Sequence, residues 1–131
     1  KLQEKYARVE RELVEWEEYY TEDAEYLFVA YGISARISLS ATRNLREKNL
    51  RAGLLRPKTL YPFPAQRLKE LSQQVKQMAV VELSNGQMAA DVELAIASQV
   101  PVQKYNWMGG KVPSTDEVVA LAEKDIKKLR G

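Results

Sequence analysis

Four short runs of apolar, strand-forming residues alternate with helical segments along most of this chain, and this alternation restricts the folds that it can adopt. The runs occupy residues 26–31, 52–55, 77–83 and 102–107, and helical segments are expected at 35–48, 65–74, 87–98 and 115–129. Strands separated by helices of this length form parallel sheets with helices on both faces. Because such crossovers are right-handed, we predict an α/β fold, a three-layer α/β/α domain with a mainly parallel sheet of about four strands in the order 2-1-3-4.

Side chains with a known capping role mark the expected helix ends. Ser34 is the predicted N-cap of the first helix of this domain, and Asn49 is its predicted left-handed C-cap. Ser114 and Glu117 have the spacing of a capping box ahead of the last helix. The helix boundaries therefore rest on capping chemistry as well as on periodicity.

The first 23 residues carry a different pattern. Apolar residues recur there every three or four positions, at Leu2, Tyr6, Val9, Leu13, Trp16 and Tyr20. This spacing predicts an amphipathic connector helix over 1–23, ahead of the α/β domain over 24–131. The helix is expected to pack on its own or a neighbouring domain, or to pair with a second copy and give a homodimer.

Composition removes several classes of function. The chain of 131 residues contains no cysteine and no histidine, so Ser-His and Cys-His nucleophile systems are impossible within it. Any catalysis that it performed alone would rest on Asp, Glu, Lys or Tyr. No apolar run approaches the roughly 20 residues of a membrane-spanning helix. No membrane partner is therefore predicted.

Six basic residues lie close together in the sequence: Arg43, Arg46, Lys48, Arg51, Arg56 and Lys58. Two aromatic residues, Tyr61 and Phe63, follow them, as a nucleic-acid interface would require. Glu47 interrupts the group, and the net charge of the chain is only +2. A solvated helix face with one recognition loop is the favoured interpretation, and no nucleic-acid partner is predicted.

Small and polar residues follow the ends of two predicted strands that should be neighbours. They are Gly32, Ser34, Glu82, Asn85, Gly86 and Gln87. Ligands of parallel α/β sheets bind beyond the carboxyl ends of the strands where the connections diverge, so these residues form a candidate crevice. Neither GxGxxG nor GxxxxGK[ST] is present, and the glycines equally suit simple turn geometry.

Glu82 closes a strand that is expected to be buried. A carboxylate in this place is either a general base, for example beside Tyr31, or a hydrogen-bond acceptor for a neighbouring loop. No second carboxylate or metal-binding cluster lies near it in the sequence. The structural role is therefore favoured.

The stretch LLRPKTLYPFP, at 54–64, is rigid, aromatic and basic. Proline segments are extended and lose little entropy on ordering, aromatic rings supply contact area, and arginine forms bidentate ion pairs. We predict that this stretch docks on another domain or subunit, through Arg56, Pro57, Thr59, Tyr61, Pro62, Phe63 and Pro64. The alternative is a plug that closes the edge of the domain's own sheet.

These motifs together resemble the C-terminal domain of the alpha subunit of 2-oxoacid:ferredoxin oxidoreductases, of the 2-oxoisovalerate (ketoisovalerate) or 2-oxoglutarate type. The resemblance covers residues 25–126 and is carried by Leu55-Arg56-Pro57, Thr59-Leu60, Pro62-Phe63-Pro64, Val81-Glu82, Asn85-Gly86-Gln87 and the segment from Ala30 to Arg36. It implies a fold similar to the transketolase C-terminal domain. A further antiparallel edge strand, which that family's sheet can carry, is not found in the sequence.

The resemblance implies an enzyme that oxidatively decarboxylates a 2-oxoacid to acyl-CoA and passes electrons to ferredoxin. Thiamine diphosphate, Mg²⁺ and [4Fe–4S] clusters are expected in the parent complex and not in this chain, which lacks cysteine. The expected partners are the rest of the alpha subunit, the beta-, gamma- and delta-type subunits and, through the complex, ferredoxin. A cytoplasmic location is expected.

The chain is thus predicted to be a non-catalytic assembly domain, inactive by itself. Two other functions stay open: a stand-alone α/β ligand-binding or regulatory domain that uses the candidate crevice, and an acid–base enzyme that uses Glu82 and Tyr31. The sequence leaves undecided which 2-oxoacid is used, whether coenzyme A contacts this domain, and the oligomeric state.

Overall fold

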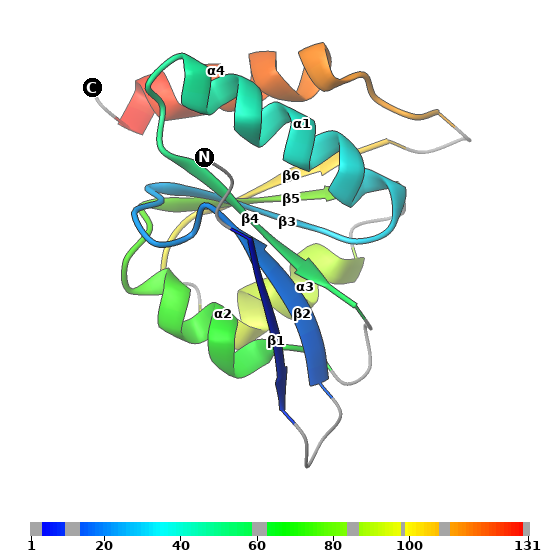
Figure 1. Ribbon diagram of the computed structural model, residues 1–131, viewed down its shortest axis with the longest axis vertical. Helices are drawn as coiled ribbons and strands as arrows, with labels where there is room; N and C mark the ends of the chain where they lie inside the picture. The colour runs from blue at the N-terminus through cyan, green and yellow to red at the C-terminus, as the bar shows by residue number, and fades with distance from the viewer. Residues whose placement is uncertain are drawn as a thin grey trace.

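The described residues form one six-stranded sheet with helices on both faces (Figure 1). The computed structural model describes residues 4–9, 14–58, 63–83, 87–97, 99–107 and 111–129, with the backbone alone for 4–9 and for Gln87. The strands are β1 (Glu4–Val9), β2 (Val14–Tyr19), β3 (Tyr26–Ala30), β4 (Ala52–Pro57), β5 (Gln77–Glu82) and β6 (Val102–Asn106). The helices are α1 (Ile33–Glu47), α2 (Ala65–Ser72), α3 (Gln87–Ile96) and α4 (Thr115–Leu129).

The parallel part of the sheet confirms the predicted fold class and order. Strands run β1-β2-β4-β3-β5-β6, and β4, β3, β5 and β6 are mutually parallel. Helices α1 and α4 cover one face, and α2 and α3 cover the other (Figure 1). Each face has its own apolar core, and every residue of β3 and β5 is buried. Burial on both faces explains why these strands read as continuous apolar runs.

The predicted helix over 1–23 is wrong, because the described part of this segment forms two antiparallel strands. Strand β1 pairs with β2, and β2 pairs antiparallel with β4, so that Trp16 lies opposite Pro57. Within β2 the order Val-Glu-Trp-Glu also has the period of a strand, and Val14 and Trp16 both enter the core on the α2 side. Pairing with the open edge of β4 outweighs the helical preference of the glutamates.

This hairpin changes two other expectations. It supplies an antiparallel edge strand, β1, that was not found in the sequence, and it belongs to the same sheet as the rest of the domain. The expected homodimer rested on a helical seam from Leu2 to Tyr20, and the described residues of this segment form strands instead. The hairpin is therefore part of the α/β fold, and its described residues do not form the separate connector helix that was expected.

The inner strand of the hairpin is bound to α2 through Glu18. Its carboxylate, in a side chain only 1% exposed, accepts hydrogen bonds from Arg67 Nε at 2.6 Å and Arg67 Nη2 at 3.0 Å. Trp16 Nε1 and Thr21 Oγ1 donate to the same carboxylate at 2.8 and 2.7 Å. Burial by itself raises the pKa of Glu18, but the hydrogen bonds from Arg67, Trp16 and Thr21 outweigh it and hold the pKa below its ordinary value.

At the start of β4, Gly53 packs closely against the turn that connects β2 to β3. A Cβ atom on Gly53 would lie 2.8 Å from the backbone oxygen of Tyr20 and 3.0 Å from Cβ of Ala24. Arg46 Nη2 donates to the same Tyr20 oxygen at 2.9 Å and to Asp23 Oδ1 at 2.7 Å, and Nε donates to the oxygen of Ala52 at 2.8 Å. The hydrogen bond from Arg46 also lowers the pKa of Asp23. Arg46 therefore joins the start of β4 to the turn between β2 and β3.

The capping predictions have mixed outcomes. Asn49 has φ of 63° and adopts the predicted left-handed conformation after α1. Ser114 and Glu117 form the predicted reciprocal capping box: Ser114 N donates to the Glu117 carboxylate at 2.8 Å, and Glu117 N donates to Ser114 Oγ at 3.1 Å. Ser34 is not the N-cap of α1, because the helix begins at Ile33 and Gly32 is the cap residue.

Three polar groups join α4 to the sheet. The hydroxyls of Tyr26 and Tyr105 are 2.5 Å apart, and Tyr105 donates to the carboxylate of Asp125. Tyr26 Oη is also 3.4 Å from Asp125 Oδ2. Burial, together with the Asp125 carboxylate, raises the pKa of both phenols, so they stay protonated and remain hydrogen-bond donors.

The change Tyr105→Phe should lower the free energy of unfolding by about 1 kcal/mol, because the buried Tyr26 hydroxyl keeps only its long contact with Asp125. Urea unfolding followed by circular dichroism measures the change. Tyr31→Phe, at a side chain 45% exposed, is the matched control and should have little effect. Equal losses in the two variants would show that the buried network contributes nothing.

Candidate functional site

A cavity of about 370 Å³ opens at the carboxyl ends of β3 and β5. It is lined by Tyr31, Gly32, Ile33, Ser34, Glu82, Leu83 and Met88. From β3 the chain crosses to β4 on one side, and from β5 it crosses to β6 on the other. The cavity therefore lies at the point where the connections diverge, which is where ligands of such sheets bind.

The structure brings three of the predicted crevice residues to this cavity: Gly32, Ser34 and Glu82. Gln87 is the first residue of α3, and Asn85 and Gly86 lie outside the described residues. The cavity is also lined by Ile33, Leu83 and Met88, which were not predicted from the sequence. Each is next to a predicted residue, or in the first turn of the helix that follows, so strand ends and helix starts taken together would have indicated them.

Both carboxylate oxygens of Glu82 are occupied by the start of α3. Oε1 accepts from the backbone N–H of Met88 at 3.1 Å, and Oε2 accepts from that of Ala89 at 3.0 Å. The side chain is buried. Glu82 thus satisfies two of the unpaired N–H groups at a helix N-terminus, which is a structural role and not the geometry of a general base.

The start of α1 is arranged differently. Gly32 has φ of 65°, a conformation that favours glycine, and no side chain caps the helix. Ser34 lies in the first turn, only 2% exposed, at the wall of the cavity. In the described part of the chain, the buried side-chain atoms without a hydrogen-bond partner are Ser38 Oγ and Gln77 Oε1, and the Ser34 hydroxyl is not one of them. The α1 side of the cavity is therefore marked by a helix start that no side chain caps.

The described members of the predicted docking segment contact their own domain. Arg56 Nη1 lies 3.3 Å from Glu17 Oε1, and Pro57 is buried in β4. Pro64 is buried, and Phe63 packs against the core under α2. Thr59, Tyr61 and Pro62 lie outside the described residues. For the four described residues these contacts favour the intradomain plug.

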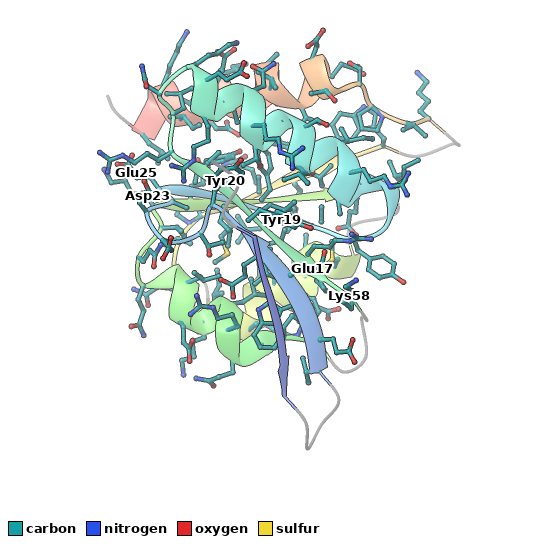
Figure 2. All side chains as sticks on the ribbon, in the orientation of Figure 1. Glu17, Tyr19, Tyr20, Asp23, Glu25 and Lys58 are labelled. Atoms are coloured by element: carbon teal, nitrogen blue, oxygen red, sulfur yellow. The ribbon has the colours of Figure 1, made fainter. Side chains whose placement is uncertain are left out.

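A charged cluster around Glu17 lies beside this segment. Figure 2 shows Glu17 and Lys58 near one end of β4, and Asp23 and Glu25 toward the opposite side of the molecule. Lys58 Nζ is 3.2 Å from Glu17 Oε2, and Tyr19 Oη donates to Oε1 at 2.9 Å. Burial raises the pKa of Glu17, but Tyr19, Lys58 and Arg56 together bring it below its ordinary value. Glu17 thus neutralises part of the charge that Arg56 and Lys58 bring to the predicted basic patch, which agrees with a structural role for these residues.

Among the described residues, no group of three or more Asp, Glu, His or Cys side chains is placed to hold a metal ion. No described helix has the length and apolar character that crossing a membrane requires.

Comparison with known proteins identifies the domain. The sequence profile described as "Pyruvate:ferredoxin oxidoreductase core domain II" matches residues 24–118. The chain belongs to this family. Membership in the core domain II family confirms the resemblance to 2-oxoacid:ferredoxin oxidoreductases that the strand-end motifs carry.

Among curated proteins, this core domain II chain is similar to the ketoisovalerate oxidoreductase subunit VorB of Methanothermobacter marburgensis. The two are 47% identical over 130 residues, which cover 99% of this chain and 36% of VorB. The chain spans about a third of the length of the curated relatives that it matches most strongly.

Two solved structures share the fold of this core domain II chain. A split-gene transketolase, described as an inactive beta4 tetramer, has a TM-score of 0.68 at 20% identity and covers 79% of this chain and 38% of its own. The 2-oxoglutarate:ferredoxin oxidoreductase of Magnetococcus marinus has a TM-score of 0.65 at 17% identity and covers 95% of this chain and 20% of its own. The transketolase-like fold that the resemblance implied is therefore confirmed.

Proposed function

We propose that this chain is a non-catalytic assembly domain of the alpha subunit of a 2-oxoacid:ferredoxin oxidoreductase. The observation that carries the proposal is the match of core domain II over 24–118, together with 47% identity to a ketoisovalerate oxidoreductase subunit. The parent enzyme would convert a branched-chain 2-oxoacid to its acyl-CoA and pass the electrons to ferredoxin. Its partners would be beta-, gamma- and delta-type subunits, in the cytoplasm.

The donor groups of this chain do not fit the iron–sulfur clusters of such an enzyme. Protein thiolates are the usual cluster ligands, and the sequence contains no cysteine. Glu82, the buried carboxylate of the cavity, already binds two backbone N–H groups of α3. In this proposal thiamine diphosphate, Mg²⁺ and the clusters belong to other parts of the complex, and this chain supplies structure and contact surface.

The alternative is a stand-alone ligand-binding or regulatory domain. The cavity of about 370 Å³ favours it, because it lies where α/β sheets bind ligands. The two proposals differ in what the isolated chain should bind. An assembly domain offers this cavity to protein, and a regulatory domain offers it to a small molecule.

Purification of the complex that contains this chain tests the proposal. The complex should reduce ferredoxin in a reaction that requires 2-oxoisovalerate and coenzyme A, with a slower rate on 2-oxoglutarate. The isolated chain should be inactive and give no heat when titrated with Mg²⁺–thiamine diphosphate, coenzyme A or 2-oxoacids. Micromolar binding of any of these by the isolated chain would instead support the regulatory alternative.

A further inference from the structure

We propose that the outward side of α1 binds an acidic protein segment through two arginines, Arg36 and Arg43. The segment belongs to the part of the parent subunit that lies outside this chain, so the inference rests on the proposed function. We call the exposed residues Ile33, Arg36, Ser40 and Arg43 the arginine face of α1.

The spacing of these residues places them on one side of the helix. They follow one another at intervals of three, four and three positions, and residues with this spacing are neighbours on a helix surface. Arg36 and Arg43 are two turns apart, so their Cα atoms are separated by about 10 Å along the axis. A partner that bonds to both must present two carboxylates at a similar separation, which a small acid such as a 2-oxoacid cannot do.

The two arginines of this face differ from the other arginines of the domain in having no internal ion pair. Four of the six arginines whose side chains are described pair with carboxylates of the chain, namely Arg46 with Asp23, Arg51 with Glu25, Arg56 with Glu17 and Arg67 with Glu18. Within the same described residues, Arg36 and Arg43 form no ion pair, and α1 has no acidic residue before Glu47. Their planar guanidinium groups can therefore form bidentate hydrogen bonds with carboxylates from outside the chain.

Helix α4 lies beside α1 on the same side of the sheet and allows a comparison of composition (Figure 1). Its exposed charged residues are acids and lysines: Asp116, Glu117, Lys124, Lys127 and Lys128. Its exposed large apolar side chain, Leu121, is 37% exposed. Protein interfaces are enriched in arginine and aromatic residues and depleted in lysine, aspartate and glutamate. The outward side of α4 thus has the composition of a solvated surface, and the arginine face has that of an interface.

Apolar surface adjoins the arginines at the start of α1. Tyr31 is 45% exposed and Ile33 is 53% exposed, and both also line the cavity at the end of β3. Neighbouring exposed apolar side chains mark a surface that another protein covers. Ser40, between the two arginines, is small and leaves room for the backbone of a partner. The segment that fits this face therefore carries an apolar side chain near Ile33 as well as the two carboxylates.

The pairing of the nearby basic residues favours a protein over a nucleic acid. A nucleic acid requires several cations that follow its phosphates. Of the basic residues in the group 43–58, all except Arg43 pair with carboxylates of this domain, and the net charge of the chain is only +2. Two unpaired arginines beside an apolar patch suit an acidic protein segment better.

The occupant is placed in the same subunit because most of that subunit is missing from this chain. The chain covers 33% and 36% of two ketoisovalerate oxidoreductase subunits, so about two thirds of a parent of that length lies outside it. A second polar surface exists at the start of β4, where Asp23, Arg46, Asn49, Leu50 and Arg51 line a cavity. Both arginines of that cavity already have carboxylate partners. The arginine face is therefore the better site for an acidic segment.

Carbodiimide coupling in the intact parent complex tests the proposal through Arg36→Lys and Arg43→Lys. Each variant keeps the positive charge and adds an amine, which carbodiimide joins to a carboxylate in contact with it. Mass spectrometry of the digest should show each new lysine linked to an Asp or Glu of the same subunit outside this chain. Lys124 and Lys128 of α4, present in the same sample, are the matched controls and should give no such product.

Charge reversal measures the strength of the contact. In the double variant Arg36→Glu with Arg43→Glu, the new charges should repel the docked carboxylates, and the backbone amides of the cross-linked segment should exchange hydrogen about tenfold faster. The same reversal at Lys124 and Lys128 changes the net charge equally and should leave this exchange unchanged. All four residues are exposed, so both double variants should fold.

The outcomes separate the docking site from the proposed function. No product from either new lysine, in a complex that oxidises 2-oxoacids, would overturn the docking site and leave the proposed function intact. A product only on another subunit, or faster exchange of residues 33–43 after nuclease treatment, would also overturn it, because the occupant would then be a different one. A parent complex without 2-oxoacid activity would instead contradict the proposed function.

Discussion

The change Arg67→Met should lower the free energy of unfolding by about 3 kcal/mol, one of the two largest effects that we expect in this domain. Glu18 would remain buried, with its charge balanced only by hydrogen bonds from Trp16 and Thr21. The hairpin would also lose its ionic contact with α2. Denaturant unfolding at neutral pH measures the loss, and Lys69→Ala, an exposed basic residue on the same helix, is the matched control.

The free energy of unfolding should also depend differently on pH in the unsubstituted protein and in the Arg67→Met variant. The pKa of Glu18 lies below its ordinary value of 4.5, so its contribution to stability is complete above that value and is lost as the pH falls through the lowered pKa. Without Arg67, burial would raise the pKa of Glu18 and remove this loss. The stability difference between the two proteins should therefore shrink from about pH 7 to about pH 3. A constant difference would mean that Glu18 does not titrate with folding.

Gly53→Ala should cost about 2 kcal/mol, because the new methyl group has no room. Its Cβ would lie 2.8 Å from the Tyr20 oxygen, which also accepts a hydrogen bond from Arg46. To admit the methyl group, the turn before β3 must shift and weaken the Arg46 contacts. Thermal and denaturant unfolding measure the effect.

Gly32→Ala is the informative control for this substitution. A Cβ on Gly32 meets nothing within 4 Å, so only the strain of its backbone conformation, with φ of 65° and ψ of −136°, opposes the change, at a cost of about 1–3 kcal/mol. The two glycines are thus required for different reasons, one for space and one for backbone conformation. The absence of any loss in Gly53→Ala would contradict the packing argument.

The four parallel strands and their helices were predictable because the residues of each element are enough to indicate its type. The run Met78–Val81 is apolar throughout, as burial on both faces requires, and Ser114 with Glu117 marks a helix start by side-chain chemistry. The hairpin was not predictable in the same way. Trp16 and Tyr20 fit a helical spacing, and only the partner strand β4, about 40 residues later, decides otherwise.

The candidate site was predictable in place and less so in detail. Strand order alone put Gly32, Ser34 and Glu82 at one edge of the sheet, where the cavity is found. Which carboxylate oxygen meets which N–H depends on how α3 begins, and the sequence does not encode that locally. The same holds for Arg56, whose partner Glu17 lies on a strand that the sequence analysis took for a helix.

The strand order has a consequence for synthesis on the ribosome. Strand β4 lies between β2 and β3 in the sheet but follows both in the chain. When β2 and β3 have emerged from the ribosome, the strand that pairs with both, β4, has not yet been made available. Glu18 of β2 can meet its partner, Arg67 of α2, only later still. The hairpin can therefore join the nascent sheet only after residue 57 has left the exit tunnel, and its ion pair can form only after residue 67.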